Sequence, residues 1–146
     1  MTGMELMDLE RAKQRLEEDD ACCVLVHNDQ IIERHTQGVR PLLELLDQQA
    51  DLKGFAAADK VVGRAAASLY VLLGVTSVYG ETMSIAGQAM LEEHGIASSC
   101  GTLVQQIMNR SRTGICPMEA AVARMEDVSK APELLKAAIM KMRQGH

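Results

Sequence analysis

The chain has 146 residues, a length that suits one compact domain with its own hydrophobic core. Hydrophobic residues make up 47% and charged residues 24%, which is typical of a folded globular domain and excludes disorder over the body of the chain. The net charge of -5 and the small number of aromatic residues (one Phe, two Tyr, no Trp) disfavour nucleic acid as a partner, because a basic surface and base-stacking rings are both scarce.

The first third of the chain predicts a helix, a hairpin and a second helix. Residues 7–20 carry apolar residues at helical spacing behind Asp8, the expected N-cap, and residues 1–7 are expected to be flexible. Residues 22–35 contain two β-rich runs around an Asn-Asp pair, a pattern that indicates a hairpin. Residues 40–49 carry a proline in the first turn and leucines on one face, which predicts a helix.

The remaining chain alternates short apolar strands with helices. Strands are predicted at 55–58, 75–79 and 96–100, and helices at 60–73, 85–94, 117–125 and 132–142. Asp59 is the expected N-cap of the helix at 60–73, and Gly74 is its expected end. Residues 80–84 are expected to form a loop in which Ser84 or Thr82 caps the helix that follows, and residues 101–114 receive no assignment. We interpret residues 1–146 as one α/β domain, a three-layer α/β/α sandwich with a mixed sheet of about five strands.

Targeting and membrane segments are not expected. The N-terminal residues are charged and periodic, and they lack the apolar stretch of a signal peptide. The longest apolar run, 65–78, is too short to cross a bilayer and is interrupted by Gly74. The sequence therefore predicts a cytoplasmic protein without a membrane partner, whose four cysteines are reduced thiols.

Three segments carry a family resemblance: AAADKVVGRAAASLY (56–70), YGETMSIAGQAMLEEHGI (79–96) and NRSRTGICPMEAAV (109–122). Together they make the chain, from about residue 8 to 124, resemble an uncharacterised family of small microbial proteins with a cytidine-deaminase-like fold. The resemblance implies a three-layer sandwich in which the helix from Lys60 takes the place of the first metal-bearing helix of true deaminases.

The resemblance suggests zinc-dependent deamination as a hypothesis, but the residues of this sequence argue against it. A zinc deaminase needs His-x-Glu or Cys-x-Glu at one helix start and Pro-Cys-x-x-Cys at another. The two helix starts here are DKVVGRAAA and ETMSIAGQAM, without His or Cys, and the four histidines lack ligand spacing. The sequence therefore predicts no metal site, no cofactor and no zinc-dependent deamination.

Cys116 and Glu119 are the candidate catalytic residues. Cys116 stands at a helix start, where the helix dipole stabilises a thiolate, and Glu119 would serve as the acid or base. A carboxylate near the third helical position opposes ionisation of the thiol, and no histidine can be placed beside it as a base. The alternative, which we favour, is a structural helix start with Pro117 in the first turn and Glu119 bonded to a free N–H of the same helix.

Seven further residues are candidates for ligand binding: Asp59, Lys60, Arg64, Glu81, Asn109, Arg110 and Thr113. Lys60 and Arg64, four residues apart, would share a helical face and hold an anion, although a solvated basic edge is the alternative. Glu81 would accept hydrogen bonds from a base or sugar, and its alternative is a structural turn. The arginine-containing segment 109–114 would contact a polar ligand if it folds over the cleft, and it would otherwise be an ordinary surface loop.

The leading hypothesis is a zinc-free, deaminase-like domain that binds a small polar ligand, a nucleotide or its derivative. One alternative is a thiol-dependent enzyme that uses Cys116 with Glu119. Another is a homo-oligomeric interaction module built from the small-residue helix at 60–73 and the Met-rich C-terminal segment. The sequence identifies neither the substrate nor the oligomeric state.

Overall fold

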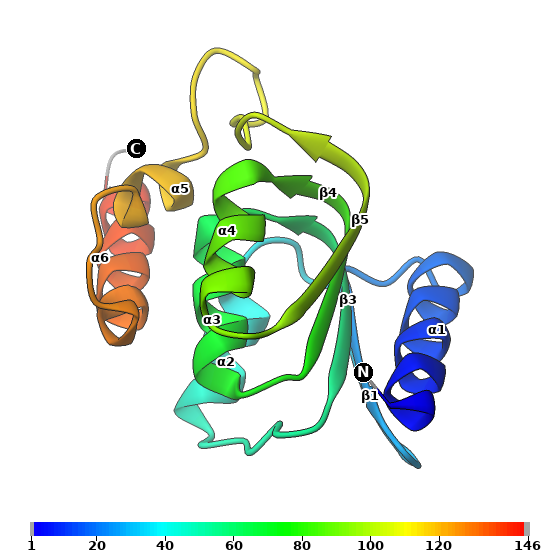
Figure 1. Cartoon of the computed structure of the whole chain (residues 1–146). Helices are drawn as coiled ribbons and strands as arrows, with labels where there is room; N and C mark the ends of the chain where they lie inside the picture. Colours follow the sequence, from blue (N-terminus) through cyan, green and yellow to red (C-terminus); the bar gives the residue numbers. More distant parts are fainter. Residues whose placement is uncertain (1, 145–146) are drawn as a thin grey trace.

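A five-stranded mixed sheet forms the centre of the computed structural model, which describes residues 2–144 (Figure 1). The strands are β1 (Cys23–His27), β2 (Gln30–Arg34), β3 (Ala56–Val62), β4 (Ser77–Ser84) and β5 (Ala97–Val104), arranged in the order β2-β1-β3-β4-β5. β1 is antiparallel to both neighbours, whereas β3, β4 and β5 are mutually parallel. The three parallel strands therefore end at one edge of the sheet, the usual place for a ligand site in an α/β fold.

Helices cover both faces of this sheet. α1 (Gly3–Glu18) packs against one face, and α2 (Arg40–Asp47), α3 (Arg64–Leu73) and α4 (Ile85–Glu93) cover the other (Figure 1). α5 (Pro117–Val122), a 3-10 turn (Val128–Lys130) and α6 (Ala131–Gln144) pack on the outer side of α3. The predicted α/β sandwich with a five-stranded mixed sheet is confirmed. None of the helices in residues 2–144 has the length and apolarity that crossing a bilayer requires.

The central strands are apolar on both sides because both sides are covered. In β1, Val24 and Val26 pack toward α1, while Cys23 and Leu25 pack toward the α2–α4 layer. This alternation follows from the two-residue period of a strand. It explains why these strands lack the polar alternation of a half-exposed sheet.

Several predicted element ends are confirmed, and each depends on a residue with special backbone or capping chemistry. The hairpin turns at Asn28, which has a positive φ of 53°. Pro41 lies in the first turn of α2, and Gly74 ends α3 with a φ of 83°. Ser84 caps α4 by accepting a hydrogen bond from the Gly87 N–H at 3.0 Å.

The predicted start of the first helix is wrong. α1 begins at Gly3, where Thr2 and Glu5 form a capping box, and it ends at Glu18. Asp8 does not cap it. Its buried carboxylate instead accepts a hydrogen bond from the Asn28 N–H of the hairpin turn at 3.4 Å. The contact that holds Asp8 lies 20 residues away in the chain, so the local pattern contained no sign of it.

The predicted ends of the three parallel strands are also wrong. β3 continues through Asp59 to Val62, so the helix does not begin at Lys60 and its N-cap is Gly63. Residues 80–84, expected to be a loop, form the second half of β4. β5 likewise extends to Val104, beyond the predicted 96–100. Pairing between β3, β4 and β5 extends all three strands together, and cross-strand partners of this kind override local propensity.

Candidate functional site

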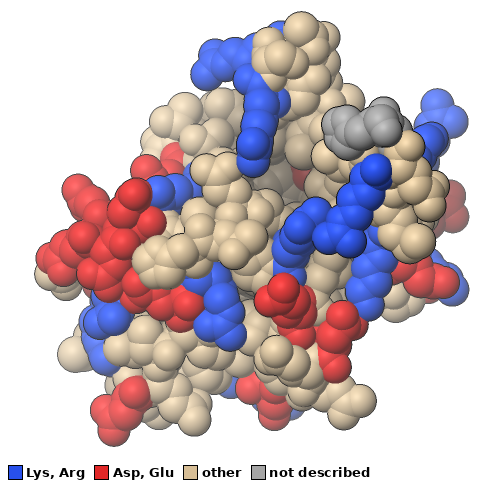
Figure 2. Space-filling view, turned by 180° about the vertical axis from the view of Figure 1, so that it is seen from behind, with Lys and Arg blue, Asp and Glu red and all other residues tan. Residues whose placement is uncertain are grey.

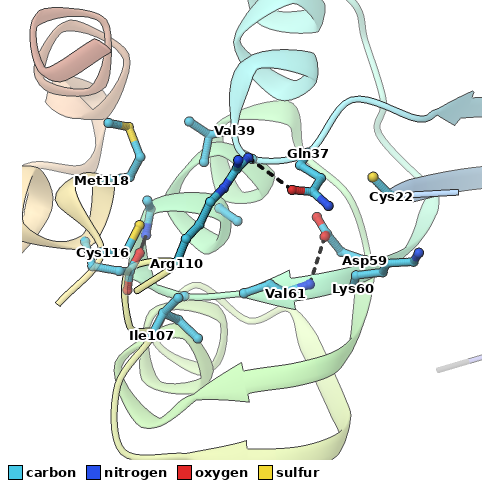
Figure 3. A pocket seen from close by; sticks show the side chains of 15 residues that line it. Cys22, Gln37, Val39, Asp59, Lys60, Val61, Ile107, Arg110, Cys116 and Met118 are labelled. Carbon is cyan, nitrogen blue, oxygen red and sulfur yellow. Dashed lines mark hydrogen bonds between the residues drawn. The ribbon is translucent and has the colours of Figure 1, made fainter. Parts of the chain in front are cut away.

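A cleft of about 360 Å³ lies at the sheet edge where β3 ends and α3 begins. Its walls come from β3, the first turn of α3, residues 37–39 before α2, the segment after β5 and the start of α5. Much of the wall is apolar: Val39, Val61, Ala65, Ala66, Ile107 and Met118. The polar side chains that line it are Cys22, Gln37, Asp59, Lys60, Arg110, Cys116 and Glu119 (Figure 3). A concave, largely apolar pocket of this size with a few polar groups is typical of a small-molecule site.

Asp59 places a carboxylate at the wall of the cleft. Its Oδ1 accepts a hydrogen bond from the Val61 N–H at 3.2 Å (Figure 3). Its Oδ2 accepts one from the Tyr70 hydroxyl at 2.7 Å. Burial raises the pKa of Asp59 to about 6, although these hydrogen bonds act in the opposite direction. The carboxyl group therefore changes its ionisation close to neutral pH, which is typical of functional carboxylates.

Lys60 and Arg64 do not share a helical face, contrary to the sequence-based expectation. Lys60 belongs to β3, and its Nζ forms an ion pair with Asp20 at 2.6 Å on the surface. That hydrogen bond raises the pKa of Lys60 and lowers the pKa of Asp20. Arg64 is the first residue of α3, and its guanidinium donates to the carbonyls of Val122 at 2.9 Å and Met125 at 2.7 Å. Both cationic side chains are thus already bonded to other groups of the protein.

Glu119 joins α5 to the start of α3. Its carboxylate accepts hydrogen bonds from the Arg64 N–H at 2.7 Å and the Ala65 N–H at 2.8 Å, and the residue is 8% exposed. The expected bond to a free N–H of its own helix is wrong, because Glu119 satisfies the free N–H groups of α3 instead. Gly63 leaves space for it, since a Cβ at that position would overlap the carboxylate.

Cys116 is the N-cap residue of α5, and its partly buried thiol lines the cleft. Among the described residues, no hydrogen bond joins its Sγ to Glu119. The Glu119 carboxylate is already bonded to two backbone donors. The candidate catalytic pair therefore shares a cleft without sharing a hydrogen bond.

The other sequence candidates divide between the cleft and the rest of the surface. Arg110 lines the cleft, and its guanidinium donates to Gln37 Oε1 at 3.2 Å (Figure 3). Asn109 and Thr113 do not line it and instead bond to each other within their loop, Nδ2 to Oγ1, at 3.1 Å. Glu81 is exposed and faces a different groove, between α1 and β4. The structure therefore separates Glu81 from the cleft that it was expected to serve.

Sequence reasoning missed the residues that form the outer wall of the cleft. Gln37 and Val39 come from the segment before α2, Cys22 precedes β1, Ile107 follows β5, and Met118 lies in α5. The only local signal was the turn at Gly38, which has a φ of 88°. A turn residue does not show which distant strand the segment will face.

The start of α3 and the start of α4 do not fit a zinc ion. Zinc sites in catalytic proteins use three side-chain ligands, mostly His, Cys and carboxylates. The helix starts present Gly63 and Arg64 in one case and Ser84 and Ile85 in the other. Within residues 2–144, no three His, Cys, Asp or Glu side chains come together as a group able to hold a metal. These side chains therefore give no basis for a reaction step that uses a metal ion.

Comparison with known proteins supports the fold. A protein-family model described as Domain of unknown function (DUF1893) matches residues 11–139. The structure of a DUF1893 family protein from Thermotoga maritima aligns with 24% identity over 91% of this chain and 88% of its own, with a TM-score of 0.79. No curated protein matches the chain.

Two deaminases align more weakly. A dCMP deaminase from cyanophage S-TIM5 shows 13% identity over 68% of this chain and 99% of its own, with a TM-score of 0.45. A diaminohydroxyphosphoribosylaminopyrimidine deaminase/5-amino-6-(5-phosphoribosylamino)uracil reductase from Thermotoga maritima shows 16% identity over 67% of this chain and 36% of its own, with a TM-score of 0.46.

Proposed function

The chain belongs to the DUF1893 family of domains of unknown function, and we propose that it is a zinc-free, deaminase-like domain that binds a small polar molecule, a nucleotide or its derivative. The binding site is the cleft between β3, α3, α5 and the segment before α2. The observation that carries the proposal is the half-buried carboxylate of Asp59 at the wall of a largely apolar cleft, where its pKa is raised to about 6.

Asp59 suits a ligand that donates hydrogen bonds. Each carboxylate oxygen accepts one bond from the protein and retains a second lone pair. Tyr70 and the backbone hold the group in place, so a ligand does not have to order it. A planar ring edge with two N–H donors matches a carboxylate, and its faces match apolar walls such as Val61 and Ile107. Nucleobases combine these two properties.

A second candidate function, thiol-dependent chemistry, is favoured by one observation. The Cys116 thiol lines the same cleft as Asp59, so a ligand bound there would lie near it. In this alternative Cys116 is the nucleophile, and Glu119 would have to leave the α3 N–H groups to act as the acid or base. If alkylation of Cys116 only weakens ligand binding, the thiol merely lies in the cleft where the ligand binds. A covalent adduct between Cys116 and a ligand would support thiol-dependent chemistry.

Calorimetry with nucleosides and nucleotides tests the proposal, with Asp59→Asn as the principal variant. The matched control is Asp29→Asn, which removes the same charge from the exposed hairpin turn. We expect at least one nucleoside or nucleotide to bind the native protein, and Asp59→Asn to weaken it at least about tenfold, because a hydrogen bond to a charged group contributes about 1.5–3 kcal/mol. Asp29→Asn should leave the affinity unchanged.

Thermal melting of each variant shows whether it is folded before its affinity is interpreted. If no nucleoside or nucleotide binds, the proposal loses its support. Equal affinities of folded Asp59→Asn and native protein would equally contradict it, because the carboxylate is the group on which the proposal rests.

A further inference from the structure

A groove of about 730 Å³ adjoins the cleft and carries a concentration of arginine side chains. It shares Gln37, Gly38, Val39, Arg110 and Met118 with the cleft, so the two hollows lie side by side. Its three arginines come from separate elements: Arg40 begins α2, Arg110 follows β5, and Arg143 lies in the last turn of α6. No acidic side chain is among the described residues that line it.

Among the residues that the structure describes, no acidic side chain pairs with any of the three guanidinium groups, whereas six other cations form ion pairs. Ion pairs neutralise Arg11, Lys13, Arg15, Lys60, Lys130 and Lys136. Within residues 2–144, neither Arg40 nor Arg143 forms a salt bridge, and Arg110 bonds only to the neutral amide of Gln37. His35, which also lines the groove, bonds to Glu33 at 3.0 Å. The described residues of the groove therefore carry positive charge that no described acidic side chain of its lining balances.

This charge stands out because the protein is acidic, with a net charge of -5. Figure 2 shows acidic side chains crowded over α1, while basic side chains border the hollow between α6 and the loop that follows β5. On the face shown in Figure 2, basic side chains thus gather on both sides of this hollow. A concave positive region concentrates anions, and guanidinium groups match phosphate oxygens by paired hydrogen bonds.

We propose that this groove binds the phosphate groups of the ligand whose ring occupies the cleft, so that the ligand is a nucleotide with two or three phosphates. The inference rests on the proposed function and adds where the phosphate end of the ligand binds. Arg110 lines both hollows and lies at their junction, where the first phosphate would follow the sugar. Arg40 and Arg143 contact the outer phosphates.

The size of the groove favours a phosphate chain over a single phosphate. Its volume of about 730 Å³ is about twice the 360 Å³ of the cleft, and its three cations stand on three elements. A long nucleic acid fits less well, because the acidic surface over α1 repels a phosphate backbone. The three aromatic residues of the chain, one Phe and two Tyr, do not line the groove or the cleft.

Calorimetry with the full chain tests the inference, using four nucleosides, their 5′-monophosphates and 5′-triphosphates, and inorganic tripolyphosphate as probes. We expect a triphosphate to bind at least a hundredfold more tightly than its nucleoside, with an affinity that falls as salt rises. Arg40→Ala and Arg143→Ala should each weaken triphosphate binding about tenfold and leave nucleoside binding unchanged. Arg110→Ala should weaken triphosphate binding at least as much.

Two matched controls remove the same charge beside the groove without touching its wall. Arg112→Ala changes the loop that carries Arg110, and Lys141→Ala changes the helix that carries Arg143. Both controls should retain native triphosphate affinity. Equal losses in the control and groove variants would overturn the inference, because they would show general charge attraction rather than a site.

The outcomes separate the inference from the proposed function. If nucleoside and triphosphate bind equally and Asp59→Asn weakens both, the groove inference is overturned while the proposed function stands. If tripolyphosphate and triphosphates bind through the arginines but Asp59→Asn changes nothing, the groove stands and the proposed function fails. A mixed-sequence oligonucleotide that binds more tightly than every triphosphate, or no binding of any probe, would overturn the inference.

Discussion

Removing the Glu119 carboxylate is expected to free the start of α3 from α5. Glu119→Ala leaves the N–H groups of Arg64 and Ala65 without acceptors, in a region where Ala65 is 1% exposed. Each unsatisfied buried donor costs about 1–3 kcal/mol, and loss of a helix cap costs about 1 kcal/mol. Because the two estimates count the same groups in part, we expect the free energy of unfolding to fall by about 2–4 kcal/mol. Glu119→Gln keeps one oxygen acceptor but loses the charge, so we expect a fall of about 1–2 kcal/mol.

Gly63→Ala tests the same contact from the other side. The backbone at Gly63 has a φ of -100° and a ψ of -170°, a conformation that alanine also adopts, so the substitution causes no backbone strain. The added Cβ meets the Glu119 carboxylate and displaces it from the α3 N–H groups. Gly63→Ala alone should therefore be destabilising by about as much as Glu119→Ala. In the Glu119→Ala background it should cost much less, giving a coupling energy of at least about 1 kcal/mol.

Urea unfolding followed by circular dichroism measures these free energies, and amide hydrogen exchange at Arg64 and Ala65 localises the effect. Glu126→Ala is the matched control, since this exposed carboxylate lies just beyond α5 and forms no hydrogen bond with a described residue. A change smaller than about 0.5 kcal/mol for Glu119→Ala, or additive effects of the two substitutions, would refute the assigned role of Glu119.

Two other predictions follow from titratable groups whose pKa values are raised by burial. Burial raises the pKa of Asp59 from 3.8 to about 6, so between these pH values the native chain keeps a proton that the unfolded chain loses. The free energy of unfolding should fall by up to about 3 kcal/mol as pH rises across this range; Asp59→Asn should remove this decrease, and an unchanged pH profile in urea unfolding would contradict it. Burial, followed by the charge of Asp59, raises the pKa of Cys23 to about 12, so iodoacetamide at neutral pH should label Cys22 and Cys116 well before Cys23. Mass spectrometry of the native protein measures these rates, and equally rapid labelling of Cys23 would contradict its burial.

The parts of the fold that the sequence predicted correctly depend on residues close to one another in the chain. Asn28 in the hairpin turn, Pro41 in a first helical turn, Gly74 at a helix end and Ser84 at a helix start each act through their own backbone or their immediate neighbours. The alternation of apolar strands and helices likewise indicated a sheet covered on both faces. Such features require no knowledge of distant contacts.

The candidate site was predicted only in part, and the failures share a cause. Asp59 looked like a helix cap because an apolar helical pattern follows it, yet pairing with Cys23 on β1 and Gly80 on β4 keeps it in a strand. Glu119 was expected to serve its own helix, but it bonds to residues more than fifty positions earlier in the chain. Local patterns contain neither partner.

The sequence alone thus determined the class of fold, the helix and strand alternation and the presence of Asp59, Arg110, Cys116 and Glu119 in the segments that reach the cleft. Only the tertiary structure decided that Arg64 and Glu119 bind each other's helices, that Glu81 faces away, and that Arg40 and Arg143 meet Arg110 along one groove. The physical reason is that turns and caps are set by neighbouring atoms, whereas a site is assembled by strand pairing and helix packing between segments far apart in the chain.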